Sequence, residues 1–271
     1  DTGRETLREL GMPIAEPKTV EPTQSTTVLG RTLDSVAQTI GVSEDHIKYA
    51  GAEIARILRD GRTTKRRFHT LAGLLGFLAP VVRGAKFRMR PFWRHLRKLK
   101  LRRTTPVPKD LRRDLEWWSQ RVVSGDIPPT SRWRCPATFD LDLLYTDASG
   151  DWGAGIHWLD RFFSHQWTEE HRDESVVFKE LWPVIQFFRR FAKQLTGKTV
   201  VVATDSLVNA YAFLAGSSSS ATGSDMLREL SDLMLKHDFD VHFQWMPREY
   251  NVVADLLSKG SLPGEPLLQQ R

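Results

Sequence analysis

The spacing of apolar residues predicts a mainly helical first half of the chain. Within 42–59, Ile47, Ala50, Ile54 and Leu58 recur at the spacing of one helix face. Before this helix, 27–33 is expected to form a strand or hairpin. Three more helices are expected after it: one that begins at Thr63 or Thr64 and ends by Pro80, one over 91–101, and one after 106–108.

From residue 139 onward, apolar and polar residues alternate, which predicts strands. The expected order is strands over 139–147, 153–159 and 161–168, a helix over 177–195, a Val-rich strand over 199–203, helices over 206–214 and 225–237, a strand over 239–245 and a helix over 247–258. A strand, a crossover helix and a second strand form a βαβ unit. The strands that end near 147 and 204 should therefore be parallel neighbours in a mixed α/β sheet.

Composition narrows the class of protein. Hydrophobic residues make up 40% of the 271 residues and charged residues 27%, as in a globular protein with a core. The one cysteine, Cys135, excludes an internal disulfide and a thiolate metal site. The longest apolar stretch, 71–82, is interrupted by Gly and Pro and is too short to span a bilayer. With no signal segment in view, we expect an intracellular protein without membrane contact.

Charge is divided unequally between the two halves. The formal net charge is +6, but 56–113 holds nineteen Lys and Arg against two acids, a net +17, which leaves −11 for the remainder. Like charges at this density repel one another unless an anion binds them. The pattern favours a nucleic-acid-binding half joined to an acidic half over a set of solvated helix faces.

Two aspartates follow the predicted parallel strands. Asp147 and Asp205 stand at the carboxyl ends of these strands, where open α/β sheets bind ligands. Two carboxylates so close repel each other unless a cation lies between them. Asp205 can instead cap the helix that follows it. That alternative explains either residue alone but not both together.

Two further acids can join this pair. Glu180 borders the apolar face of its helix, where burial is costly without a partner; the alternative is a glutamate at the surface edge of that face. Asp255 lies four residues after Asn251 and shares its helix face, or both belong to a polar outer face. Four carboxylates at one sheet end suit two hard cations, above all Mg²⁺, which promote phosphodiester hydrolysis.

Motifs in the second half resemble the ribonuclease H domain of retroelement reverse transcriptases. They are Tyr145-Thr146-Asp147-Ala148-Ser149, Trp152-Gly153-Ala154-Gly155, Lys179-Glu180-Leu181-Trp182, Ala203-Thr204-Asp205-Ser206, Trp245-Met246-Pro247-Arg248-Glu249-Tyr250-Asn251 and Ala254-Asp255-Leu256-Leu257-Ser258. The resemblance spans 139–260 and implies a ribonuclease H-like mixed five-stranded sheet with flanking helices. It implies Asp147, Glu180, Asp205 and Asp255 as the catalytic acids that hold two Mg²⁺ ions, with Mn²⁺ able to replace them.

The first half resembles the preceding part of the same polyprotein. Residues 10–14, 17–19 and 28–30 resemble the end of a reverse transcriptase palm with its primer-grip hairpin, and 63–99 resembles the thumb that follows. Among retroelements, the similarity is to the DIRS-like retrotransposons. The implied organisation is a palm remnant over 1–35, a basic helical thumb-like region over 36–124, a linker over 125–138, the ribonuclease H-like domain over 139–260 and a tail over 261–271.

Three departures from the family pattern affect the expected function. The Tyr-x-Asp-Asp motif of the palm is missing from this chain, so polymerisation would need a partner chain that carries fingers and palm. Cellular ribonucleases H carry a histidine before the last helix, whereas 245–248 has none. Pro183 lies inside the Glu180 helix and is expected to kink it at a cost of about 3 kcal/mol.

These observations predict an Mg²⁺-dependent endoribonuclease that cuts the RNA strand of an RNA–DNA hybrid. Its basic half is expected to contact backbone phosphates with weak sequence preference. The residues expected to bind nucleic acid are Lys65, Arg66, Arg67, Arg83, Lys86, Arg88, Arg90, Arg94, Arg97 and Lys98. Phe92, Trp117, Trp118 and Trp133 can stack on bases, but packing is the expected role for most of them.

Two other functions compete with this prediction. The first is a domesticated, non-catalytic RNA-binding scaffold subunit of a ribonucleoprotein. The four acids favour the enzyme over this scaffold, because a scaffold gains nothing by holding repelling carboxylates together. The second is a transposase or integrase with the same fold, which would require a glutamate where Asp255 stands.

Overall fold

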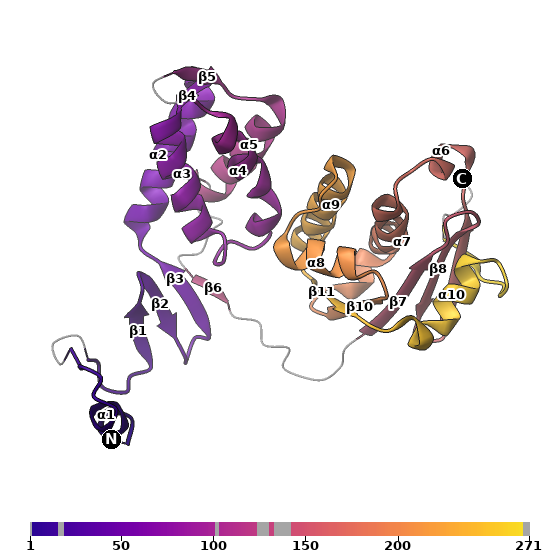
Figure 1. The fold of residues 1–271 in the computed structure, drawn as a ribbon, viewed down its shortest axis with the longest axis horizontal. Coiled ribbons are helices and arrows are strands. Elements are labelled where there is room, and N and C mark those ends of the chain that lie inside the picture. Colours follow the sequence, from indigo (N-terminus) through magenta and orange to yellow (C-terminus); the bar gives the residue numbers. More distant parts are fainter. Residues whose placement is uncertain (1, 16–18, 101–102, 124–129, 133–141, 268–271) are drawn as a thin grey trace.

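The computed structural model describes residues 2–15, 19–100, 103–123, 130–132 and 142–267. Its elements gather in two halves, a helical half and an α/β half, each with its own buried apolar cluster (Figure 1). The helical half contains α2 (Glu44–Asp60), α3 (Lys65–Leu78), α4 (Arg90–Lys98) and α5 (Lys109–Val123), the 3-10 helix η2 (Ala85–Arg88), and the paired strands β4 (Arg62–Thr64) and β5 (Thr104–Pro106). The four predicted helices of this half are thus confirmed.

The core of the helical half consists of the apolar faces that the sequence pattern predicts. Ile54 of α2 and Phe68 of α3 are fully buried, and Thr64 caps α3 by accepting a hydrogen bond from the amide of Arg67. Phe92 and Trp118 are also fully buried, so these two aromatic residues pack in the core and cannot stack on bases. Trp133 lies outside the described residues.

A small antiparallel sheet flanks the helical half. It contains, in spatial order, β1 (Ser25–Val28), β2 (Arg31–Asp34), β3 (Thr39–Val42) and β6 (Thr130–Arg132), and α1 (Thr2–Glu9) precedes it. The predicted hairpin over 27–33 is confirmed, since Leu29 and Gly30 form its turn with positive φ. Strand β6 lies inside the predicted linker and forms there because its backbone pairs with the edge of β3. The remainder of that linker lies outside the described residues.

The α/β half is built on a mixed six-stranded sheet in the order β11-β10-β7-β8-β9-β12. Its strands are β7 (Asp142–Ala148), β8 (Gly153–Trp158), β9 (Arg161–Gln166), β10 (Thr199–Thr204), β11 (Asp240–Trp245) and β12 (Glu265–Pro266). Its helices are α6 (Glu169–Arg172), α7 (Val176–Phe191) with the 3-10 helix η3 (Ala192–Leu195), α8 (Leu207–Ala215), α9 (Ala221–His237), η4 (Arg248–Tyr250) and α10 (Val252–Ser258).

The prediction of five strands is wrong by one. The sixth strand, β12, comes from the expected tail and pairs in parallel with β9. Two residues are too few to produce an alternating pattern, but Leu267 next to them is buried in the core and anchors them. The predicted last helix is also divided, into η4 and α10, and α9 begins four residues earlier than predicted because Ser220 caps it.

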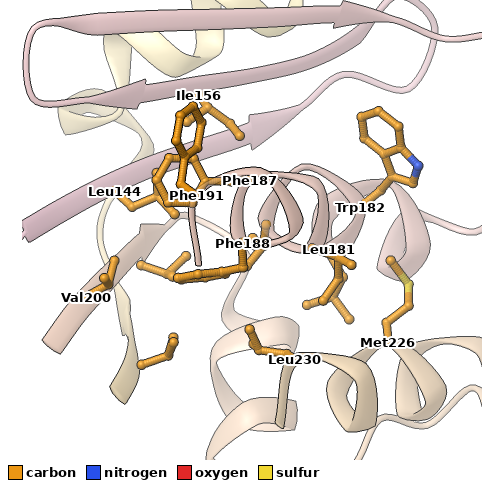
Figure 2. Packing of buried hydrophobic residues seen from close by; sticks show 14 of the residues in the cluster. Leu144, Ile156, Leu181, Trp182, Phe187, Phe188, Phe191, Val200, Met226 and Leu230 are labelled. Atoms are coloured by element: carbon orange, nitrogen blue, oxygen red, sulfur yellow. The ribbon is translucent and has the colours of Figure 1, made fainter. Parts of the chain in front are cut away.

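Helix α7 packs its apolar side against one face of this sheet. Phe187 and Phe188 are fully buried and meet Leu144 and Ile156 of the sheet in the same cluster (Figure 2). The helix continues through Pro183 without a break, so the expected kink does not interrupt it. Helix α10 covers the opposite face, where a Cβ at Gly155 would lie 2.3 Å from the carbonyl oxygen of Ala254. Only glycine allows this approach.

Ion pairs join the helical half to the α/β half. Asp114 of α5 is fully buried and accepts hydrogen bonds from Arg88 at 3.4 Å and from Arg228 of α9 at 3.1 Å. Arg88 also contacts Asp232 of α9 at 2.5 Å. We call this set, together with Arg113 and Asp225, the ion network between the halves: Arg88, Arg113, Asp114, Asp225, Arg228 and Asp232.

The opposite charges of the two halves therefore partly neutralise each other. Arg83 contacts Asp238 at 2.7 Å and Asp240 at 2.8 Å, in addition to the ion network between the halves. Gly84, with φ +81°, brings the chain so close to α9 that a Cβ would lie 2.5 Å from Ser231 Oγ. Acidic residues of the same chain thus neutralise part of the +17 charge of 56–113. The pattern of the sequence alone does not reveal this pairing.

No helix in the described part of the chain is both long and apolar enough to cross a membrane.

Candidate active site

The centre of the candidate site is the end of two neighbouring parallel strands. Strand β10 pairs in parallel with β7, and Ala203 lies opposite Tyr145 in the register. Asp205 and Asp147 each follow two residues later, so both lie at the carboxyl ends of these two strands, on the same end of the sheet. The predicted parallel pairing and the meeting of these two aspartates are confirmed.

Helix α7 adds a third carboxylate to this edge. Carboxylate oxygens of Asp147, Glu180 and Asp205 all lie within 4.8 Å of one another, and we call these three residues the carboxylate triad. Asp147 is 4% exposed, and the other two are half-buried. Because α7 is unbroken at Pro183, Glu180 is held over the sheet rather than displaced from it.

The electrostatics of the carboxylate triad are unfavourable without a cation. Burial, together with the charges of Asp147 and Asp205, raises the pKa of Glu180 to about 8. Burial also raises the pKa of Asp147, against the hydrogen bond from Ser258. Glu180 Oε2 is buried and has no hydrogen-bond partner. A buried acceptor of this kind is costly unless a ligand satisfies it.

These residues fit a hard divalent cation. Carboxylate oxygens are the ligands that Mg²⁺ and Mn²⁺ prefer, and three of them converge from β7, α7 and the end of β10. A cation there would offset the mutual repulsion and satisfy Glu180 Oε2. Within the described residues, this is the one group of at least three His, Cys, Asp or Glu side chains with such a geometry.

Asp255, the fourth predicted ligand, is not part of this group. Its Oδ1 accepts a hydrogen bond from Arg248 Nη2 at 2.6 Å, and its Oδ2 accepts one from Lys259 Nζ at 2.6 Å. Although burial acts to raise the pKa of Asp255, the hydrogen bonds from Lys259 and Arg248 lower it. The carboxylate is therefore charged and already paired.

Sequence reasoning missed three residues that support the site. Ser258 donates to Asp147 Oδ2, and Lys179 is buried and donates to the carbonyl oxygens of Gly150 and Arg172, both at 2.7 Å. The third is Arg248, which donates to Asp255 Oδ1. Lys179 adjoins Glu180 in the chain and Ser258 lies one helical turn after Asp255, so spacing is the signal that points to these two; Arg248 lies seven residues before Asp255 and has no such signal. Asn251 is also tied to the site, through a 2.9 Å hydrogen bond to the carbonyl of Thr146.

The predicted nucleic-acid-binding residues lie in two groups. Arg83, Arg88 and Arg90 face the α/β half; Arg90 donates to Ser224 Oγ and to the carbonyl of Ser219. The ammonium of Lys86 lies 4.4 Å from the ring centre of Phe213. Within the described residues, the side chains of the second group form no hydrogen bond or ion pair with the α/β half. The second group consists of Lys65, Arg66, Arg67, Arg94, Arg97 and Lys98, of which Arg94 pairs with Asp110.

The second group is concentrated near one end of the helical half. Lys65, Arg66 and Arg67 directly follow β4, and the exposed Arg103 directly precedes β5. Because Thr64 pairs with Thr104, these basic residues lie at the same end. Arg66 and Arg67 are exposed, as are Arg97 and Lys98 in the last turn of α4.

Comparison with known proteins gives distant structural likenesses only. No protein-family model matches the chain, and no curated protein sequence does. A foamy viral protease-reverse transcriptase in complex with double-stranded DNA aligns with TM-score 0.37 and 14% identity over 89% of this chain and 41% of its own. The foamy viral protease-reverse transcriptase in complex with an RNA/DNA hybrid aligns with TM-score 0.33 and 12% identity over 94% and 32%.

A ribonuclease H1 isolated from compost by a metagenomic approach, LC11-RNase H1, is also similar. It aligns with TM-score 0.32 and 19% identity over 44% of this chain and 93% of its own. The present chain spans less than half the length of the foamy viral chains that it matches.

Proposed function

We propose that this chain is an Mg²⁺-dependent endonuclease that hydrolyses the RNA strand of RNA–DNA hybrids. The observation that supports it most is the carboxylate triad, in which burial and two neighbouring aspartates raise the pKa of Glu180 to about 8 and its buried Oε2 has no hydrogen-bond partner. Such an arrangement is unstable on its own and becomes favourable around a cation. The motifs of the sequence support a retroelement reverse transcriptase as the parent polyprotein, and we extend the proposal to the DIRS-like type on these sequence motifs alone.

Asp147, Glu180 and Asp205 would hold the cation, which supplies Lewis-acid activation of the scissile phosphate and acidifies the attacking water. The rest of the site keeps these ligands in place. Ser258 fixes the Asp147 carboxylate, and Asn251 ties the end of β7 to α10. Lys179 bonds the loop after β7 to the segment before α7. This rigidity lets the carboxylates act without rearranging.

The exposed basic residues of α3 and α4 would bind the hybrid. Arg66, Arg67, Arg97 and Lys98 are exposed, and none of them forms an ion pair with another residue that the structure describes. Guanidinium and ammonium groups on a surface bind phosphates through charge rather than base identity. Weak sequence preference is therefore expected, and Arg83 and Arg88 contribute to the structure rather than to binding.

The experiment is cleavage of a hybrid with a labelled RNA strand by the purified full chain in Mg²⁺. We expect fragments with 3′-hydroxyl ends, loss of cleavage in EDTA, and loss in Asp205→Asn, which keeps shape but removes a ligand charge. Asp160→Asn, an exposed aspartate in the β8–β9 turn, is the matched control and should cleave normally. Binding of the hybrid without any cleavage in Mg²⁺ or Mn²⁺ would reject the nuclease and favour the RNA-binding scaffold.

A further inference from the structure

One arginine lies between the carboxylate triad and Asp255. Arg248 opens η4, directly after Pro247 and three residues after the last residue of β11. Its Nε and Nη2 contact Asp255 Oδ1 at 3.2 and 2.6 Å, and its Nε lies 4.0 Å from Asp205 Oδ2. A single guanidinium thus spans the space between the carboxylate triad and the one predicted ligand outside it.

The charges around Asp255 differ from those of the triad. Asp255 has a cation on each oxygen, Arg248 on one and Lys259 on the other. Among the described residues, the triad contacts a basic side chain only through the 4.0 Å approach of Arg248 to Asp205. One cation would therefore satisfy the triad, whereas Asp255 has no need of another.

We propose that the Arg248 guanidinium, anchored by Asp255, takes the place of a second metal ion, so that this centre works with one divalent cation. The inference rests on the proposed nuclease function. Arg248 Nη1 has no hydrogen bond to a described residue, so it can donate to an oxygen of the scissile phosphate. A guanidinium is permanently charged and presents its donors in a plane that suits phosphate oxygens. Arg248 keeps its proton and forms no covalent bond, and Asp255 is a positioning residue.

The test counts bound ions in the full chain. Calorimetric titration with Mn²⁺ is carried out on the free chain and on its complex with a hybrid whose 2′-O-methylated RNA strand resists cleavage. We expect one Mn²⁺ per wild-type chain in both cases and a second, weaker Mn²⁺ in the complex of Arg248→Gln. Asp255→Asn should leave the affinity for the first Mn²⁺ nearly unchanged, whereas Asp205→Asn should weaken it by at least about tenfold.

Two conservative variants sharpen the result. Arg248→Lys keeps the positive charge and should keep the count at one, and Lys259→Gln, which removes the other cation on Asp255, should also keep it at one. In cleavage assays, Arg248→Gln should lose roughly a hundredfold in rate, as when an oriented transition-state donor is removed, and Arg248→Lys should recover part of it. Two Mn²⁺ ions in the wild-type complex, or loss of an ion in Asp255→Asn, would overturn the proposal.

Failure of this inference can be told apart from failure of the nuclease function. A wild-type chain that cleaves hybrid and binds two Mn²⁺ ions retains the nuclease and loses the role of Arg248. A chain that binds one Mn²⁺ but cleaves no hybrid loses the nuclease, and the role of Arg248 in cleavage with it.

Discussion

Ser258, at the end of α10, donates a 2.5 Å hydrogen bond to Oδ2 of Asp147 in β7, although 111 residues separate them in sequence. Both side chains are buried. Helix α10 thus fixes a predicted metal ligand from the face of the sheet that lies opposite to α7. Burial raises the pKa of Asp147, and this hydrogen bond acts in the opposite direction.

Removal of this hydroxyl should weaken both the fold and the site. We expect Ser258→Ala to lose about 2 kcal/mol in the free energy of unfolding, because the charged acceptor remains buried. The pKa of Asp147 should rise, so Mn²⁺ affinity should fall more at pH 6 than at pH 8. Urea denaturation and calorimetry measure the two effects. Ser261→Ala, at an exposed position three residues further on, should change neither.

The raised pKa of Glu180 predicts a pH-dependent stability in the metal-free chain. Its pKa is about 8 in the folded chain, against an ordinary value of 4.5. The folded state therefore holds this proton more tightly, and the stability that it contributes is lost as pH rises from about 4.5 to 8. In EDTA, Glu180→Gln should be more stable than wild type by a few kcal/mol at pH 8 and by little at pH 5.

The same proton must leave when a cation binds. Calorimetry at pH 7 in buffers of different ionisation enthalpy should show that Mn²⁺ binding releases about one proton from the wild-type chain. Glu174→Gln, at an exposed position, should match wild type in both experiments. Equal stability of wild type and Glu180→Gln at every pH would show that Glu180 is not held in this buried, repelled state.

The ion network between the halves should couple their unfolding. Asp114→Ala leaves Arg88 and Arg228 buried without their common acceptor, and breaking a buried pair in this way costs about 3–5 kcal/mol. We expect one urea transition in wild type and two in this variant, followed by circular dichroism and tryptophan fluorescence. Arg94→Ala breaks an exposed pair with Asp110 and should cost no more than about 1 kcal/mol.

The exposed basic residues of α3 should set the salt dependence of hybrid binding. On a B-form duplex, each lost phosphate contact reduces the slope of log K against log salt by about 0.9. We expect Arg66→Glu with Arg67→Glu to flatten the slope for hybrid by a similar amount for each residue, equally for unrelated sequences. The double variant Lys193→Glu with Lys236→Glu makes the same charge change in the α/β half and is the control. An unchanged slope in the α3 variant would remove this surface from the proposed interface.

The sequence was sufficient to predict the carboxylate triad, because its members depend on local patterns. Asp147 and Asp205 end alternating or Val-rich strands joined by one crossover helix, and that topology places them side by side. Glu180 follows from the apolar face of the same helix. Pro183 was expected to kink this helix, but α7 continues through Pro183 and packs its apolar face in the core of the sheet.

The features that sequence patterns missed depend on long-range contacts. Arg88 looks like any other basic residue of 56–113 until Asp114 and Asp232 lie beside it. Likewise, Asp255 shares a motif with Ser258, yet only the fold of η4 shows that its carboxylate faces Arg248. An excess of basic residues in a sequence indicates that negative charge is needed nearby. Only the tertiary structure shows whether a bound ligand or acidic residues of the same chain supply that negative charge.

Strand β12 has a consequence for the solubility of this protein. An open sheet edge presents unpaired amides that can recruit a strand from another molecule. Here Glu265 and Pro266 occupy the outer edge of β9, Arg161 holds Glu265 at 2.8 Å, and Arg190 donates to the carbonyl of Pro266. Proline also offers no amide for further pairing. This short strand therefore hinders the pairing of β9 with a strand of another molecule. A chain truncated before β12 would expose this edge of the sheet and would be expected to aggregate more readily.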